Sequence, residues 1–135
     1  RMVLHSANAL KVAEFLENNP KVERVYYPGL ASSPFHDRAQ ELFVEGRCGG
    51  MLSADIVGGE KGASAFIKAC ETIKLVPSLA GVTTTTSYPA KTSHRALTPE
   101  EMARAGISMG QIRFSIGLEN IDDILDELDK ALKTV

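Results

Sequence analysis

One arginine on a predicted strand is the residue best suited to bind an anionic ligand. Residues 111–116 alternate strictly between polar and apolar side chains, a period of two that indicates a strand with one buried face. The apolar members are Ile112, Phe114 and Ile116. Arg113 therefore projects from the opposite face, where its planar guanidinium could bind two oxygens of a carboxylate or phosphate. The alternation also allows a plainer interpretation, a solvated strand charge or a surface ion pair.

The other polar candidates are less specific. Ser78 lies in a Pro-Ser-Leu-Ala-Gly segment that is not a nucleophile elbow, so it could orient a ligand but has no recognisable base. The three histidines and two cysteines share no metal-ligand spacing, and no metal site is expected. The run Thr83 to Thr86 is explained by β-propensity, and the polar segment 91–95 is either solvated or a pocket wall.

Alternating helices and strands are expected to position these residues. Helices are predicted over residues 1–19, 35–44, 60–71, a short stretch after Thr98 and the segment after Asn120; strands are predicted over 22–27, 51–57, 73–76, 82–88 and 111–116. In the second helix we expect Phe35, Ala39, Leu42 and Phe43 to face the core. Thr98 and Glu101 form a capping-box pattern, and Asn120 is a suitable cap for the last helix.

The spacing of the strands indicates the fold class. Only a few residues join the strands predicted over 73–76 and 82–88, which favours an antiparallel or mixed sheet over one built from helical crossovers. The sequence therefore predicts an α+β fold. Its sheet should have four or five strands, mainly antiparallel, with helices mainly on one face.

Composition limits the classes of partner and location. The chain has 135 residues, enough for one domain with a sizeable core, and its net charge of −2 gives no reason to expect a nucleic acid or an acidic membrane as partner. No apolar run is long enough to span a bilayer. Cys48 and Cys70 are too few for a disulfide scaffold and predict reduced thiols in the cytoplasm. Because Arg1 already lies in a predicted helix, we expect the chain to be a piece of a longer protein.

Six short motifs occur in a fixed order along the chain. They are Tyr27-Pro28-Gly29-Leu30, Gly49-Gly50-Met51, Ser78-Leu79-Ala80-Gly81-Val82, Pro89-Ala90 with Ser93-His94, Gly106-Ile107, and Ile112 to Glu119. This set resembles the C-terminal domain of the pyridoxal-phosphate-dependent Cys/Met metabolism enzymes. That family contains cystathionine γ-synthase, cystathionine β- and γ-lyases, methionine γ-lyase and O-acylhomoserine sulfhydrylases. The resemblance covers essentially the whole chain, and it is specific for the family but not for the member.

The resemblance implies roles for four positions. Arg113 would grip the substrate α-carboxylate, and Ser78 would help to arrange that carboxylate and the cofactor-bearing lysine. Leu79 and Thr83 are the other implied substrate-binding positions. The sequence departs from the family pattern twice: Ala80 replaces a frequent glycine, and Thr83 replaces a glutamate that many members have, which is linked to distal-substrate and reaction preference.

The resemblance also implies a division of the protein. Residues 1–135 would form the C-terminal substrate-carboxylate domain. An N-terminal domain outside this chain would hold pyridoxal phosphate, its lysine and the other cofactor contacts. No catalytic residue is then expected in the chain, and the chain alone should be inactive. The full-length enzyme would carry out β/γ-elimination or γ-replacement on cysteine, cystathionine, methionine or O-acylhomoserine.

The implied partners are a small amino-acid substrate, the N-terminal domain and further copies of the protein, as a tetramer. The alternative is a stand-alone amino-acid-binding or interaction module without catalysis.

Overall fold

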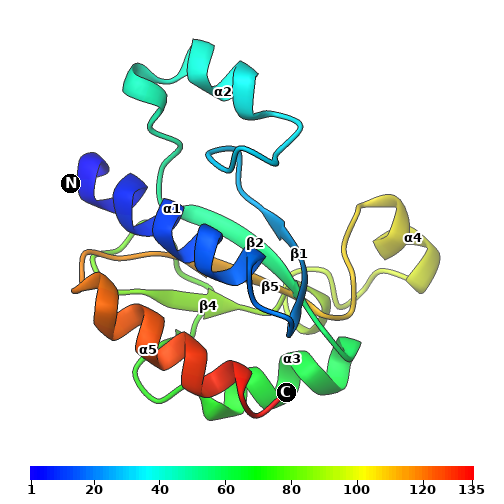
Figure 1. The fold of residues 1–135 in the computed structure, drawn as a ribbon. Coiled ribbons are helices and arrows are strands. Elements are labelled where there is room, and N and C mark those ends of the chain that lie inside the picture. The colour runs from blue at the N-terminus through cyan, green and yellow to red at the C-terminus, as the bar shows by residue number, and fades with distance from the viewer.

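A five-stranded sheet organises the chain (Figure 1). The computed structural model describes residues 1–135. The strands are β1 (Val22–Tyr26), β2 (Met51–Ile56), β3 (Lys74–Leu75), β4 (Thr85–Ser87) and β5 (Gln111–Ser115), in the spatial order β1-β2-β5-β4-β3. Three of the four pairs are antiparallel and the β3–β4 pair is parallel. The predicted α+β class and mainly antiparallel sheet are confirmed.

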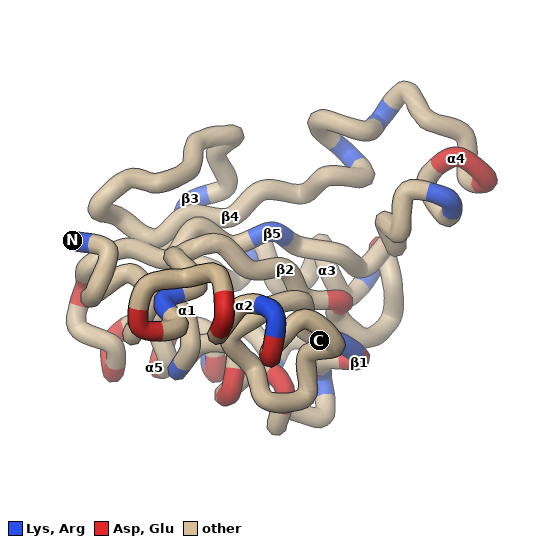
Figure 2. Tube along the Cα trace, turned by 90° about the horizontal axis from the view of Figure 1, so that it is seen from above, with Lys and Arg blue, Asp and Glu red and all other residues tan.

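Three long helices cover one face of this sheet, as Figures 1 and 2 show from two directions. They are α1 (Met2–Glu17), α3 (Gly59–Ala69) and α5 (Ile121–Leu132). Two shorter helices, α2 (His36–Leu42) and α4 (Pro99–Arg104), lie beyond the ends of the sheet, and the 3₁₀ turns η1 (Val44–Gly46) and η2 (Pro89–Lys91) complete the chain. The prediction of helices mainly on one face is therefore confirmed. None of the helices combines the length and hydropathy that a membrane crossing requires.

The core lies between the sheet and these three helices, and β5 is the central strand. Its apolar side chains Ile112 and Phe114 are fully buried, and the Phe114 ring meets Phe66 of α3 edge to face at 5.9 Å between centroids. The predicted stripe of α1 is also fully buried: Ala9, Val12, Ala13 and Leu16. Burying each large apolar side chain contributes about 1.5–3 kcal/mol, so this packing fixes β5 rigidly in the middle of the domain.

The prediction that α2 buries its apolar side chains is wrong for three of four residues. Ala39 is buried, but Phe35, Leu42 and Phe43 are 68%, 62% and 46% exposed. The helical face of the sheet is already covered by α1, α3 and α5, and α2 lies apart from them at the end of the loop that follows β1 (Figure 1). Helical periodicity identified the apolar side of this helix but could not show that nothing packs against it.

Strands β3 and β4 are shorter than predicted. β3 has two residues instead of four and β4 has three instead of seven, because residues 76–84 form a loop whose hydrogen bonds run mainly to the end of β5. The short connection predicted an antiparallel or mixed sheet. The sheet is mixed, and its one parallel pair is found at this connection.

Both predicted helix caps are present. The Thr98 hydroxyl accepts a hydrogen bond from the Glu101 backbone N–H at 3.3 Å, and the Glu101 carboxylate accepts one from the Thr98 N–H at 2.8 Å. The Asn120 side-chain oxygen accepts from the Asp122 N–H at 2.9 Å. α5 therefore begins at Ile121, a short distance beyond the end of β5 at Ser115. The capped start of this helix fixes the position of the backbone that follows the central strand.

Candidate functional site

Arg113 lies at the middle of β5 on the face of the sheet that the long helices leave open. Its cross-strand neighbours are Ser53 on β2 and Ser87 on β4, whose short side chains do not reach over the guanidinium. Arg113 is half-buried, and its guanidinium makes no hydrogen bond or ion pair with any residue of the chain. A surface ion pair within this chain is therefore excluded, and the N–H donors of the guanidinium are available to an anion.

The other arginines provide a useful comparison. Arg47 is also half-buried but pairs with Glu45, Arg38 pairs with Glu41, and Arg24 lies over the Tyr26 ring at 4.9 Å from its centroid. The remaining three are exposed and have no ion-pair partner. Arg113 is thus the only partly buried arginine without a partner, which is the state expected of a ligand-binding group.

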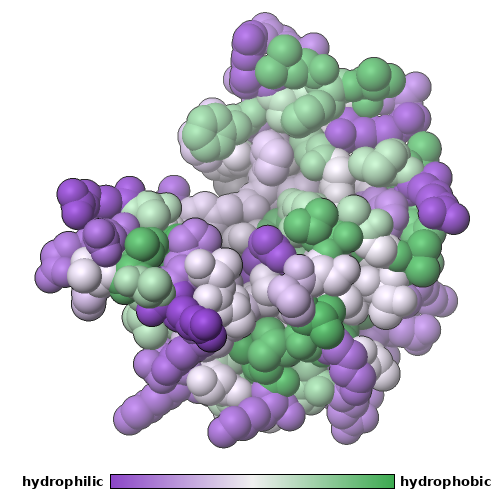
Figure 3. Space-filling model, turned by 180° about the vertical axis from the view of Figure 1, so that it is seen from behind, coloured by the Kyte–Doolittle hydropathy of each residue, from purple (hydrophilic) through white to green (hydrophobic).

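The charges around Arg113 favour an anionic ligand. Segments 72–99 and 105–118, which contain β4, β5 and their loops, carry no Asp or Glu but four basic residues. These are Lys74, Lys91, Arg95 and Arg113. Figure 2 shows the acidic residues gathered mainly on the helical side of the sheet and on α4. Figure 3 shows the opposite face, where residues of intermediate hydropathy lie between hydrophobic groups. The nearby carboxylates of Asp55, on the same face, and Glu119, just after β5, are already hydrogen-bonded within the chain, so the positive charge of Arg113 is left unpaired.

The loop that carries Ser78 and Leu79 reaches the same end of β5. Both residues are exposed, and the next residue, Ala80, donates its backbone N–H to the Ser115 hydroxyl at 2.9 Å. Ser115 is two residues beyond Arg113 and shares its face of the strand. Ala80 has φ of 60°, a left-handed conformation that costs a residue with a Cβ roughly 1–2 kcal/mol. This backbone explains why glycine suits the position where the chain has alanine.

Thr83 lies at the other end of this loop, two residues before β4 begins at Thr85. Its side chain is exposed, and its neighbour Thr84 binds the Glu119 carboxylate through both its backbone N–H and its hydroxyl. The loop that carries Ser78, Leu79 and Thr83 is thus held at the end of β5 through its other residues, Ala80, Val82 and Thr84. No hydrogen bond joins Ser78, Leu79 or Thr83 to Arg113.

Two polar networks on β5 were missed by the sequence reasoning. The first joins Thr84 to Glu119 and, separately, Ala80 to Ser115; the only available signal was that Ser115 and Glu119 belong to the motif Ile112 to Glu119. The second lies toward the start of β5, where the buried Asp55 accepts hydrogen bonds from the Tyr26 hydroxyl at 2.7 Å and the Ser108 hydroxyl at 2.6 Å. Burial and the neighbouring Asp55 carboxylate raise the pKa of Tyr26, which keeps the phenol protonated as the donor.

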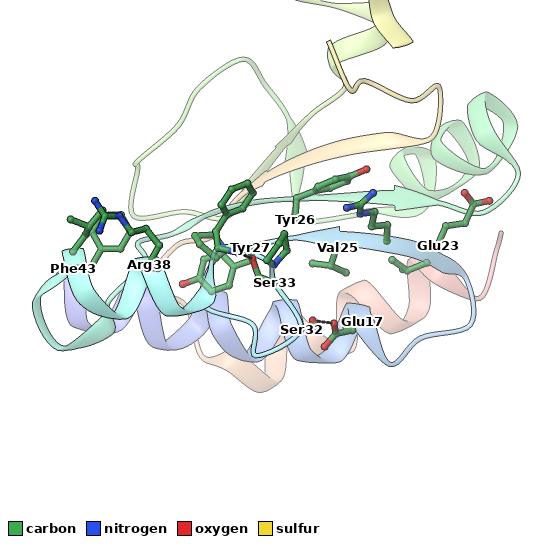
Figure 4. A pocket seen from close by; sticks show the side chains of 16 residues that line it. Glu17, Glu23, Val25, Tyr26, Tyr27, Ser32, Ser33, Arg38 and Phe43 are labelled. Atoms are coloured by element: carbon green, nitrogen blue, oxygen red, sulfur yellow. Dashed lines mark hydrogen bonds between the residues drawn. The ribbon is translucent and has the colours of Figure 1, made fainter. Parts of the chain in front are cut away.

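A cavity of about 610 Å³ is a different feature (Figure 4). It lies between β1 and α2 and includes side chains such as Val25, Tyr27 and Phe43. None of the four predicted site residues lines it, and its two arginines, Arg24 and Arg38, already have partners within the chain. The open face around Arg113, and not this cavity, is therefore the candidate site for binding an anion. No group of three or more His, Cys, Asp or Glu side chains is arranged to hold a metal ion.

Fold and site together define an α+β domain that presents one free arginine on the open face of its sheet. The chain belongs to the family of Cys/Met metabolism PLP-dependent enzymes, whose family model matches residues 1–133. The predicted family is confirmed. Its cofactor is pyridoxal phosphate.

Individual relatives agree with this assignment. The chain is 42% identical over 135 residues to an O-acetyl-L-homoserine sulfhydrylase of Leptospira meyeri, covering 100% of this chain and 30% of that protein. It is 41% identical to an L-methionine gamma-lyase of Pseudomonas putida and to a cystathionine gamma-lyase of Mus musculus, in each case covering 98% of this chain and 33% of the relative.

A solved structure has the same fold. It is a putative O-acetylhomoserine (thiol)-lyase from Campylobacter jejuni, which contains N'-pyridoxyl-lysine-5'-monophosphate. The two chains superpose with a TM-score of 0.93 at 35% identity, over 98% of this chain and 31% of that one. The chain therefore spans about a third of the length of the relatives that it matches.

The lysines of this chain do not fit the role of a covalent cofactor anchor. Such a lysine is typically desolvated, with a lowered pKa. None of the lysines here is buried, and Lys91 is hydrogen-bonded to Glu60, which raises its pKa. We derive no chemical step through the cofactor from these residues.

Proposed function

We propose that this chain is the C-terminal substrate-carboxylate domain of a pyridoxal-phosphate-dependent enzyme of sulfur amino acid metabolism. The reaction would be β/γ-elimination or γ-replacement on cysteine, cystathionine, methionine or O-acylhomoserine. The names of the relatives, which include sulfhydrylases and γ-lyases, support this range of chemistry.

One observation carries the proposal: the half-buried guanidinium of Arg113 has no partner in the chain although it lies on the central strand of the sheet. A guanidinium held in this way can bind both oxygens of an α-carboxylate. Its role is to fix the orientation of the substrate, not to transfer a proton, because a guanidinium keeps its proton under all physiological conditions. Ser78, Leu79 and Thr83 would contact the substrate from the loop at the end of β5.

The cofactor and the groups that transfer protons would belong to an N-terminal domain of the full-length protein. When bound there, pyridoxal phosphate supplies the electron sink for the reaction. The 135-residue chain by itself would be inactive, since none of its lysines is suited to hold the cofactor.

The proposed partners follow from exposed apolar surface. Met2, Val3 and Leu4 at the start of α1 and Phe35 and Phe43 around α2 are all 46% exposed or more. A surface of this kind is normally covered by another domain or subunit. We propose that the N-terminal domain and further copies, as a tetramer, cover such surfaces. We place the protein in the cytoplasm, where its two free thiols would stay reduced.

The test uses the full-length protein that carries this chain. Addition of pyridoxal phosphate should give a visible absorbance band, and the protein should release or exchange the side-chain substituent of at least one of the four substrate types. The alternative, an amino-acid-binding or interaction module without catalysis, predicts neither the band nor turnover. A protein that bound amino acids but showed neither would establish that alternative.

A further inference from the structure

The loop between β3 and β4 is tied to the end of β5 by hydrogen bonds, with little packing. Glu119 receives two of these bonds on its carboxylate, from the Thr84 N–H at 2.5 Å and from the Thr84 hydroxyl at 2.8 Å. The same hydroxyl accepts from the Gly117 N–H at 2.9 Å, and the Val82 carbonyl accepts from the Leu118 N–H at 2.8 Å. We call this set, Val82 and Thr84 with Gly117 to Glu119, the Glu119 clamp.

The clamp rests on a rigid support. The side-chain amide of Asn8 in α1 donates to the carbonyls of Gly117 and Glu119, at 3.2 Å and 3.1 Å, and His5 Nδ1 donates to the Ile116 carbonyl at 2.7 Å. The end of β5 is therefore fixed to the core through α1, and Glu119 transmits that position to the loop.

Nothing else in the chain holds the loop as firmly. Residues 77–83 are all exposed, and β3, at the loop's other end, is a two-residue edge strand. The contact is also very close, since a Cβ on Gly117 would come within 2.3 Å of the Val82 carbonyl oxygen. Apart from the single bond between Ala80 and Ser115, the clamp is what sets the position of the loop against β5.

We infer that Glu119 is a positioning residue for substrate selectivity. It fixes the loop 78–83, and with it Thr83, beside the site of Arg113; this inference rests on the proposed function. The carboxylate of a bound amino acid would meet Arg113 on the rigid strand, whereas its side chain would meet a loop whose position depends on Glu119. Loss of the clamp should therefore change discrimination between substrate side chains and leave recognition of the α-carboxylate unchanged.

The first measurement is amide hydrogen exchange on this chain, which does not depend on activity. In Glu119→Ala, exchange of the clamp amides, those of Thr84, Gly117 and Leu118, should rise about tenfold or more, as expected for the loss of charge-assisted hydrogen bonds, while β2 and β5 keep their protection. Glu119→Gln, which retains one acceptor oxygen, should be intermediate. Glu14→Ala, at an exposed glutamate whose carboxylate makes no hydrogen bond, is the matched control and should leave exchange unchanged.

The second measurement is selectivity in the full-length enzyme. O-acetyl- and O-succinyl-L-homoserine share the α-carboxylate and differ only at the far end, so the ratio of their kcat/KM values reports on the loop. We expect Glu119→Ala to change this ratio about fivefold or more, with the discrimination against an α-carboxamide substrate unchanged. Thr84→Val, which removes the hydroxyl and retains the side-chain shape, should shift the ratio in the same direction if Glu119→Ala does not fold.

An active enzyme in which Glu119→Ala altered neither the exchange of the clamp amides nor the substrate ratio would overturn this inference alone. If the ratio stayed constant while both kcat/KM values fell equally, Glu119 would be a stability residue without influence on selectivity, which also overturns it. If the wild-type full-length protein turned over neither substrate nor any other sulfur amino acid, the proposed function would fail, and the selectivity role would fail with it.

Discussion

Replacement of Arg113 is the most direct test of carboxylate binding, because the structure separates its effect on binding from its effect on folding. The guanidinium has no partner in the chain, so Arg113→Ala leaves no buried group unpaired. We therefore expect the free energy of unfolding to change by about 1 kcal/mol or less. A charge-assisted hydrogen bond to a carboxylate contributes about 1.5–3 kcal/mol, which corresponds to roughly a ten- to hundredfold change in binding or more.

In the full-length enzyme, Arg113→Lys should lower kcat/KM by about ten- to a hundredfold, because lysine keeps the charge but loses the two-pronged fit. Arg113→Ala should lower it further. The specific assay compares L-methionine with L-methioninamide: the wild type should prefer the acid strongly, and Arg113→Ala should lose most of that preference. Arg38→Ala, at an exposed arginine paired with Glu41, serves as the control and should retain it.

Two results would refute the carboxylate role. Wild-type kcat/KM in Arg113→Ala would show that the arginine does not contact the substrate. Loss of cofactor absorbance or of cooperative unfolding in the same variant would show that the arginine is structural after all.

Three further predictions follow from the fold. The isolated chain should unfold cooperatively on heating, since its sheet and three helices enclose one core. It should show no turnover when pyridoxal phosphate is added. Turnover in a preparation free of full-length enzyme would contradict the proposed division of the site. The chain should self-associate as its concentration rises, and a double variant with serine at Phe35 and Phe43 should reduce this in sedimentation; a strict monomer at high concentration would count against a covered surface. The free energy of unfolding should fall above about pH 9, because burial raises the pKa of the Cys70 thiol from 9.0 to about 12 in the folded chain. In the unfolded chain this thiol ionises first, near pH 9. The stability that is present below pH 9 is therefore lost as the pH rises toward 12. Melting temperatures from pH 8 to 11 should decline less steeply in Cys70→Ala, and equal slopes would contradict this reasoning.

The sequence predicted best the elements with a regular spacing of apolar side chains. β5 was predicted correctly because Ile112 and Phe114 alternate with polar residues and are fully buried, although the polar Gln111 and Ser115 are buried too. α1 and α5 were predicted for the same reason, with helical spacing in place of alternation. α2 shows the limit of the method: Phe35 and Leu42 lie on one side of a helix, but only the tertiary structure reveals that this side is exposed.

The site was predictable only in part for a related reason. Alternation showed that Arg113 leaves the core, but the absence of a partner depends on Ser53 and Ser87, which lie on other strands and are brought beside it by the register. The Glu119 clamp joins residues 35 positions apart in the sequence, and no local pattern indicates such a contact. The threonine run was explained by β-propensity, although Thr84 is almost completely buried because it binds Glu119.

Under the proposed function, the arrangement would separate two tasks of substrate binding. Arg113 is on a strand packed on its other face by the core, so its position is defined by many contacts and varies little. Ser78 and Thr83 are on an exposed loop, whose position depends on a few hydrogen bonds to Ser115 and Glu119. The part of the substrate common to all amino acids would therefore be bound by the rigid element, and the part that differs by the adjustable one.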